Sequence, residues 1–170
     1  RLHRSAPPPI LTHGIAMTPH DCTWMHTEAA QAADAVARQF SANAAVVAEL
    51  AAALRAKPPR FIVTCARGSS DHAATYGKYL FETALGLVTA SASPSVGSVY
   101  AVQPRLEDAL FVVISQSGKS PDLLRNAEIA KAGGARVVAL VNVTDSPLAR
   151  LAHTVLPLHA GPENSVAATK

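Results

Sequence analysis

Residues 115 to 120 combine three hydroxyl side chains, an amide, a glycine and a lysine in the order Ser-Gln-Ser-Gly-Lys-Ser. They follow an apolar run at 109–114, rich in β-branched and aromatic residues as a buried parallel strand is, and they precede a helical pattern at 121–132. A helix N-terminus leaves backbone N–H groups unpaired and carries partial positive charge, so it attracts anions. The serines could instead only fill the turn and cap the helix. Three hydroxyls in one such turn favour a site for a phosphate group.

A second hydroxyl-rich turn, Gly68-Ser69-Ser70, also lies between a predicted strand and a predicted helix. Gly68 allows close backbone approach, and the two serines offer hydroxyl and N–H donors. Alone this turn is a weak signal, because strand-to-helix turns favour glycine and serine in general. Two such turns on neighbouring strands would converge on one anion. Neither has the spacing of a P-loop, and the chain contains no G-x-G-x-x-G, so a dinucleotide cofactor is not expected.

Strand and helix patterns alternate along the rest of the chain, and they predict an α/β fold with a parallel sheet covered by helices on both faces. In such sheets ligands bind beyond the carboxyl ends of the strands, at the topological switch point. Asn43 is a candidate break in the first, alanine-rich helical stretch, and Pro58 and Pro59 end that stretch. The predicted strands are 60–64, 87–91, 109–114, 135–141 and 154–158, and the predicted helices are 26–56, 72–85, 96–102, 121–132 and 147–151.

Composition narrows the classes of function. The 170 residues suit one compact domain, and no apolar stretch approaches the roughly 18 residues of a membrane span. The formal charge is +3, aromatic residues are 5%, and the chain has no Lys/Arg cluster, so nucleic-acid binding is not expected. Cys22 and Cys65 are too few for a disulfide framework and lack metal spacing, so no metal is expected. Cys65 ends a strand and is interpreted as a small buried hydrophobe.

The chain divides into three predicted parts. Residues 1–16 contain three consecutive prolines and no periodicity, which indicates a disordered arm or sequence foreign to the natural protein, with Met17 as a plausible start. Residues 17–59 form an N-terminal helical segment, and 60–170 form the α/β domain.

The order of the motifs resembles the sugar isomerase (SIS) domain family, over about residue 24 to the end. More narrowly it is similar to the first SIS domain of the isomerase half of glucosamine-6-phosphate synthase, and equally to the SIS-type glucosamine-6-phosphate deaminases. The motifs are Gly68-Ser69-Ser70, the hexapeptide 115–120, Asn142-Val143 before Ser146-Pro147-Leu148-Ala149, and Gly161-Pro162-Glu163 through Val166-Ala167-Ala168-Thr169-Lys170.

The resemblance implies a flavodoxin-like, three-layer αβα sandwich on a five-stranded parallel sheet. It implies that the hexapeptide binds the phosphate of a sugar 6-phosphate, that the first turn contacts the substrate, and that a later loop lines the sugar. The residues concerned are Ser115, Gln116, Ser117 and Ser120 for the phosphate, Ser69 and Ser70 for the first turn, and Val166 and Ala167 for the loop. The chain departs from the family pattern at four positions. Where the family has cysteine, threonine, glutamate and serine, this chain has Arg67, Ser69, Lys119 and Ala168, respectively.

The implied function is a phosphosugar-binding domain of an aldose–ketose isomerase or deaminase acting on an amino-sugar 6-phosphate, of the glucosamine 6-phosphate to fructose 6-phosphate type. Glu163 and His72 are the nearby candidates for acid–base catalysis. The alternative is that Glu163 is a loop carboxylate that accepts N–H groups and that His72 is an ordinary surface or packing residue. The alternatives are an isomerase without deamination and a non-catalytic sugar-phosphate sensor. In two-domain relatives the proton-transfer residues lie in the second SIS domain or the tail behind it, so a second SIS domain is expected beyond residue 170. The composition suits a cytoplasmic protein, no cofactor is expected, and the resemblance implies a homodimer.

Overall fold

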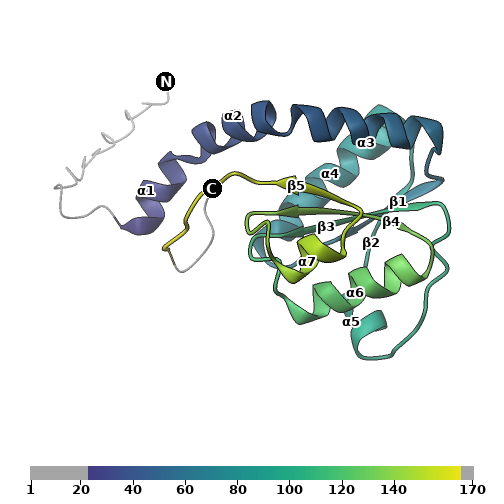
Figure 1. The fold of residues 1–170 in the computed structure, drawn as a ribbon. Coiled ribbons are helices and arrows are strands. Elements are labelled where there is room, and N and C mark those ends of the chain that lie inside the picture. Colours follow the sequence, from purple (N-terminus) through teal and green to yellow (C-terminus); the bar gives the residue numbers. More distant parts are fainter. Residues whose placement is uncertain (1–22, 166–170) are drawn as a thin grey trace, which may run out of the picture.

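The computed structural model describes residues 23–165 and forms a five-stranded, all-parallel sheet in the order β2-β1-β3-β4-β5 (Figure 1). The strands are β1 (Phe61–Cys65), β2 (Thr89–Ser91), β3 (Ala109–Ser115), β4 (Arg136–Val141) and β5 (Thr154–Pro157). The helices are α1 (Trp24–Ala30), α2 (Ala32–Ala42), α3 (Ala44–Ala56), α4 (Ser69–Leu85), α5 (Pro94–Ser98), α6 (Pro121–Ala132) and α7 (Pro147–Leu151).

The sheet is covered on both faces, which confirms the predicted α/β sandwich of three layers. On one face, α3 and α4 lie over strand residues that include the buried Ile62 and Val138, with Leu54 and Phe81 packed against them. On the other face, α6 and α7 cover a larger cluster built around residues such as Val113. Burial on both faces explains why the strands read as continuous apolar runs rather than as alternating patterns.

The strand order places a topological switch point between β1 and β3. The chain leaves β1 through α4 and returns to β2 on one side, whereas it leaves β3 through α6 and returns to β4 on the other side. The helices α4 and α6 therefore diverge to opposite faces, and a crevice opens at the carboxyl ends of β1 and β3. Both hydroxyl-rich turns, at 68–70 and 115–120, follow these two strands.

The N-terminal helices form a stepped line along one side of the molecule, and the segment after β5 runs beneath α2 toward α1 (Figure 1). The predicted break at Asn43 is confirmed, and a second break at Gln31 was not predicted. Asn43 is only 6% exposed because its amide bridges to that segment: Nδ2 donates to the carbonyl of Pro157 at 2.8 Å, and Oδ1 lies 3.3 Å from Nε2 of His159.

Several predicted boundaries shift, most clearly those of α4, α5 and β2. Helix α4 begins at Ser69 rather than at residue 72, directly after Gly68, whose φ is +59°. Helix α5 spans Pro94–Ser98 rather than 96–102, because proline is favoured in the first turn and Ala101 adopts a left-handed φ of +52° beyond the helix. Strand β2 is shorter than predicted, starting at Thr89.

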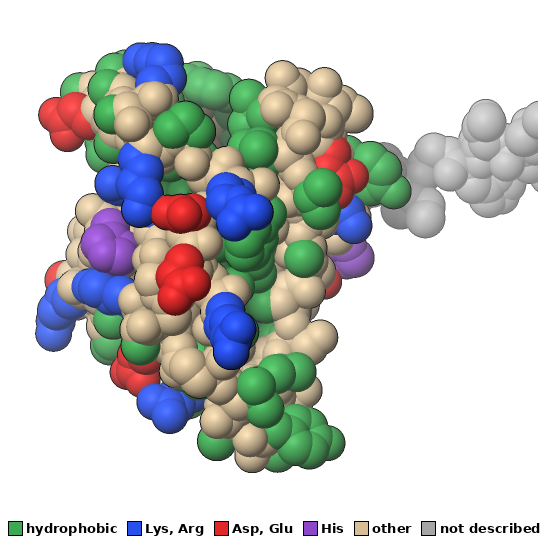
Figure 2. All heavy atoms as spheres, turned by 90° about the vertical axis from the view of Figure 1, so that its right-hand side faces the viewer, with side chains coloured by type: hydrophobic (Ala, Val, Ile, Leu, Met, Phe, Trp, Pro, Cys, Tyr) green, Lys and Arg blue, Asp and Glu red, His purple; other side chains and the backbone are tan. Residues whose placement is uncertain are grey.

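The face at the right of Figure 1, near the amino ends of the strands, mixes both signs of charge (Figure 2). There Nζ of Lys57 lies 2.7 Å from Oδ1 of Asp108. Among residues 23–165 no helix is long and apolar enough to cross a membrane, and no cluster of His, Cys, Asp and Glu in that range could hold a metal ion. The predicted arm at 1–16, Cys22 and the proposed sugar-lining residues Val166 and Ala167 lie outside the described residues.

Candidate functional site

The hexapeptide turn is held by its own serines. Ser115 closes β3 and is 5% exposed, and its Oγ accepts the N–H of Gly118 at 3.1 Å. The Oγ of Ser117 accepts the N–H of Lys119 at 3.4 Å. A hydroxyl that accepts a hydrogen bond in this way still has its own proton to donate. The turn is therefore shaped by its serines while both keep a donor that an anion could use.

Ser120 does not cap the following helix through its side chain. It occupies the N-cap position of α6, ahead of Pro121, but its side chain makes no capping hydrogen bond. The simple interpretation of this serine as a helix cap is therefore wrong. Its hydroxyl stands beside the N-terminus of α6, where partial positive charge favours an anion.

Gly118 fits a space that no other residue could occupy without a shift. Its φ is +61°, and a Cβ there would lie 2.1 Å from Oγ of Ser146. Ser146 in turn caps α7 by accepting the N–H of Ala149 at 3.3 Å, and the carbonyl of Gly118 accepts the N–H of Leu148 at 3.2 Å. The turn is thus locked against the start of α7, which fixes the direction of its backbone N–H groups.

The first hydroxyl-rich turn lies at the same edge of the sheet. Ser69 is exposed and Ser70 is half-buried, and both belong to the first turn of α4 rather than to a loop. A Cβ on Gly68 would meet nothing within 4 Å, so only its positive φ favours glycine. Because β1 and β3 are neighbours in parallel register, with Cys65 opposite Val113, the two turns leave the sheet side by side.

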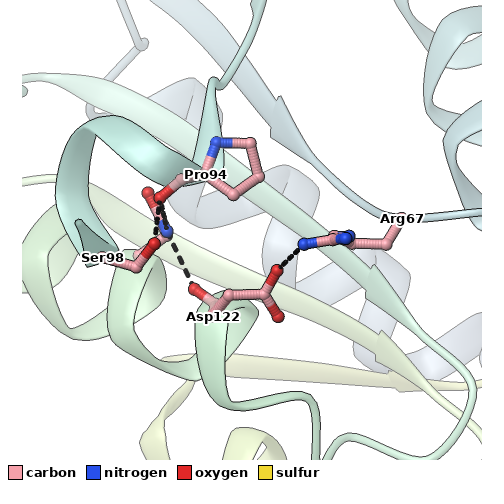
Figure 3. A network of polar contacts seen from close by, with 5 residues as sticks. Arg67, Pro94, Ser98 and Asp122 are labelled. Atoms are coloured by element: carbon pink, nitrogen blue, oxygen red, sulfur yellow. Dashed lines mark hydrogen bonds and ion pairs between the residues drawn. The ribbon is translucent and has the colours of Figure 1, made fainter.

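An ion pair joins the two turns. Arg67, between β1 and α4, contacts the carboxylate of Asp122 in the first turn of α6 (Figure 3). Asn126 extends the network, since its Nδ2 donates to the carbonyls of Asp122 at 2.8 Å and of Pro94 at 2.7 Å. Arg67 departs from the pattern of the family that the sequence resembles, but nothing in the sequence points to its partner Asp122.

A depression of about 700 Å³ opens beside the turn, at the carboxyl ends of β4 and β5. Gln116 and Glu163 both line it, so the structure brings these two candidates together. Asn142 shapes its floor: Nδ2 donates to the carbonyl of Gly161 at 2.7 Å, and Oδ1 accepts the N–H of Ala160 at 3.0 Å. The other acid–base candidate, His72, is exposed on α4 and is not among the residues that line this depression.

The loop that carries Glu163 is anchored to α1 by a buried carboxylate that sequence reasoning missed. Glu28 is 2% exposed, and its oxygens accept the N–H of Asn164 at 2.5 Å, the N–H of Ser165 at 3.3 Å and the hydroxyl of Ser165 at 2.5 Å. Arg38 of α2 donates to the carbonyl of His159 at 3.3 Å. The N-terminal helices thus hold one wall of the depression.

Cys65 is no nucleophile at ordinary pH. It is fully buried at the end of β1, and burial, reinforced by the nearby carboxylates of Asp122 and Asp71, raises the pKa of its thiol from 9.0 to about 12. The thiolate, which is the reactive form, is therefore suppressed. The interpretation of Cys65 as a small buried hydrophobe agrees with this environment.

The sequence matches both a protein-family model and proteins of known activity. Residues 57–170 match the model of the SIS domain. Over 111 residues, 64% of this chain, the sequence is 41% identical to a glutamine–fructose-6-phosphate aminotransferase (isomerizing) of Campylobacter jejuni, but the match covers only 18% of that protein.

Two solved structures are similar over most of the chain. One is an inferred phosphosugar isomerase from Silicibacter pomeroyi, 48% identical with a TM-score of 0.82, for which the match covers 86% of this chain and 45% of the other. The second is the C-terminal domain of a glucosamine-fructose-6-phosphate aminotransferase from Francisella tularensis, with a TM-score of 0.74 and 91% of this chain covered. At 24% identity and 44% coverage of that chain, it shows the fold alone.

The chain thus spans less than half of these solved relatives and under a fifth of the curated one. The match to the family model takes in β1 to β5 and both hydroxyl-rich turns. The chain belongs to the SIS domain family and is related to phosphosugar isomerases and to glutamine–fructose-6-phosphate aminotransferases.

Proposed function

We propose that this domain binds the phosphate group of an amino-sugar 6-phosphate and serves an aldose–ketose isomerase or deaminase. The observation that carries the proposal is the placement of two hydroxyl-rich turns together at the topological switch point, each opening a helix of more than ten residues. Helix N-termini and hydroxyl donors suit a phosphate group, and ligands of open α/β sheets bind at this place.

In this proposal the two turns share the phosphate. The hydroxyls of Ser115, Ser117 and Ser120 donate to its oxygens, together with the N–H groups at the start of α6. Ser69 and Ser70 contribute from the start of α4. Because Gly118 is pressed against Ser146, the donors are oriented before the ligand arrives, which reduces the ordering cost of binding.

The sugar would then lie toward the depression beside the turn. Gln116 belongs both to the hexapeptide and to the wall of the depression, so it can contact phosphate and sugar at once. Isomerisation moves a proton between C1 and C2 of the opened sugar, and deamination in addition requires water to attack an imine. Both need a base within hydrogen-bond reach. Two carboxylate residues, Asp145 and Glu163, line the depression. We retain Glu163 as the candidate base, with residues outside this chain as the alternative.

The names of the relatives support this class of substrate and leave the reaction open. The aminotransferase of Campylobacter jejuni acts on fructose 6-phosphate by its name, and the Silicibacter pomeroyi protein is assigned to phosphosugar isomerisation. An isomerase without deamination fits the same site. A non-catalytic sensor of sugar phosphates would also use the same phosphate contacts. We further propose that the natural protein works in the cytoplasm as a homodimer.

A serine substitution in the hexapeptide tests phosphate binding. Ser117→Ala removes one hydroxyl donor and should weaken binding of glucosamine 6-phosphate by roughly 1–3 kcal/mol, measured by titration calorimetry on the full natural protein. Binding of unphosphorylated glucosamine should not change. Ser41→Ala is the matched control, because Ser41 is an exposed serine of α2 that donates to the carbonyl of Ala37 at 3.2 Å.

Two results would contradict the proposal. One is equal affinity of the unsubstituted protein for the phosphorylated and unphosphorylated sugar. The other is the same loss of affinity in Ser41→Ala as in Ser117→Ala, since that loss could not come from a missing phosphate contact.

A further inference from the structure

The strongest unassigned feature is the ion pair across the switch point. Arg67 precedes Ser69 by two residues, and Asp122 follows Ser120 by two residues. Their contact therefore joins the same two turns that the proposed function assigns to the phosphate, and Figure 3 shows the guanidinium reaching the Asp122 carboxylate at the start of α6. The inference below rests on that proposed function.

Asp122 poses an electrostatic difficulty for such a site. A carboxylate in the first helical turn stabilises α6 by complementing its dipole. The same carboxylate repels a phosphate dianion that approaches the N-terminus of that helix, because both groups are negatively charged. The Asp122 side chain is only 24% exposed, so water screens its charge incompletely.

A second acid lies nearby. Asp71 is in the first turn of α4, and the carboxylates of Asp71 and Asp122 both raise the pKa of the Cys65 thiol, whereas Arg67 lowers it. All three charges therefore act on the end of β1. Arg67 and Asp71 also line a shallow depression of about 380 Å³ between the β1–α4 turn and the start of α5.

The ion pair between Arg67 and Asp122 should contribute little to the stability of the fold. The Arg67 side chain is 64% exposed, and an ion pair with such an exposed partner contributes little to folding. Asp122 has a further link to the structure through its main chain, because its carbonyl accepts a hydrogen bond from Asn126. Loss of the ion pair should leave α6 and its contact with α5 in place.

We propose that Arg67 is a positioning residue that neutralises Asp122, so that the start of α6 can accept the dianionic phosphate of the substrate. Arg67 then acts through Asp122 and need not touch the phosphate.

A double-mutant cycle tests the proposal, with affinity for glucosamine 6-phosphate and for inorganic phosphate measured on the full natural protein. Arg67→Gln leaves Asp122 uncompensated and should weaken binding of both by about tenfold at low salt, and less at high salt. Asp122→Asn should tighten binding by about twofold, since it removes the repulsion. The combination Arg67→Gln/Asp122→Asn should return affinity to within about twofold of the unsubstituted protein.

A matched ion pair on the same helix supplies the control. Arg125 and Glu128 of α6 lie 3.3 Å apart, both about half exposed, further along the helix. Arg125→Gln should leave phosphate affinity unchanged. Thermal unfolding of each variant separates a folding defect from an effect on binding, and Arg67→Lys, which keeps the charge, should retain most of the affinity.

The outcomes are distinct. If the double variant stays as weak as Arg67→Gln, then Arg67 contacts the phosphate directly and the inference is wrong. If both single variants weaken binding in proportion to their loss of stability, the pair is only structural and the inference is again wrong. If the unsubstituted protein binds neither inorganic phosphate nor glucosamine 6-phosphate, the proposed function itself fails. The inference is supported if the double variant recovers its affinity for both ligands and Arg125→Gln leaves that affinity unchanged.

Discussion

At the scale of single residues, Gly118 carries the geometry of the hexapeptide turn. Its φ of +61° is one that residues with a Cβ rarely adopt, and an added Cβ would meet both Oγ and Cβ of Ser146, at 2.1 Å and 2.7 Å. Gly118→Ala should therefore lower the free energy of unfolding by about 2–4 kcal/mol, as the sum of backbone strain and overpacking. Urea unfolding followed by circular dichroism measures this loss.

Gly86 separates the two causes. It ends α4 with a φ of +66°, close to that of Gly118, but a Cβ there would meet nothing within 4 Å. Gly86→Ala should therefore cost only the backbone strain, about 1 kcal/mol. The difference between the two variants reports the packing of Gly118 against Ser146. Equal losses would show that the contact with Ser146 does not constrain the turn.

At the scale of elements, the Glu28 carboxylate joins α1 to the loop after β5. Glu28 accepts two backbone N–H groups and a hydroxyl from Asn164 and Ser165, and it is almost fully buried. Glu28→Ala removes these acceptors, so the loop should open more often. Hydrogen–deuterium exchange should show a loss of protection of at least about tenfold at the amides of Asn164 and Ser165.

Glu49 is the control for this prediction, because it is an exposed carboxylate of α3. Glu49→Ala should leave the exchange of both amides unchanged. Glu28→Gln keeps one acceptor oxygen and should give an intermediate result. Unchanged protection in Glu28→Ala would mean that the loop is held by other contacts.

The elements also show what the sequence could and could not predict. Helix α6 matched its predicted bounds because Pro121 begins it and Gly133 ends it. Helix α4 began earlier than predicted because glycine at its N-cap gave no side-chain signal of the kind that Ser or Asp gives. The hexapeptide was recognisable because its residues are consecutive. Two contacts could not be recognised in the sequence, because their partners lie far apart along the chain. Arg67 and Asp122 are 55 residues apart, and Glu28 and Ser165 are 137 residues apart.

At the scale of the whole molecule, we expect turnover to require more than this chain. The relatives whose names carry an activity are longer, since the match covers 45% of the Silicibacter pomeroyi protein and 18% of the Campylobacter jejuni protein. We propose that a second SIS domain follows residue 170 in the natural protein and supplies proton-transfer residues. Residues 1–170 produced alone should release no ammonia from glucosamine 6-phosphate, whereas the full natural protein should either release it or form the isomer.

Ammonia assays and chromatography of the sugar phosphates make this comparison. Turnover by residues 1–170, abolished by Glu163→Gln, would contradict the expectation and would place the base in the depression that Glu163 lines. Phosphate-dependent binding by the full protein without any turnover would favour the sensor.

The anchoring of α1 by Glu28 also sets an order of events during synthesis. Helix α1 has 7 residues, too few to be stable alone in water, and its partner at Ser165 is made 137 residues later. Every strand of the sheet leaves the ribosome before that partner does. The sheet can therefore assemble first, and α1, which is translated before it, becomes fixed after it. A nascent chain that stalls when β5 has emerged from the ribosome and Ser165 has not would present a complete sheet with its first helix still undocked. Such a species is open to proteases and to mispairing with neighbouring chains.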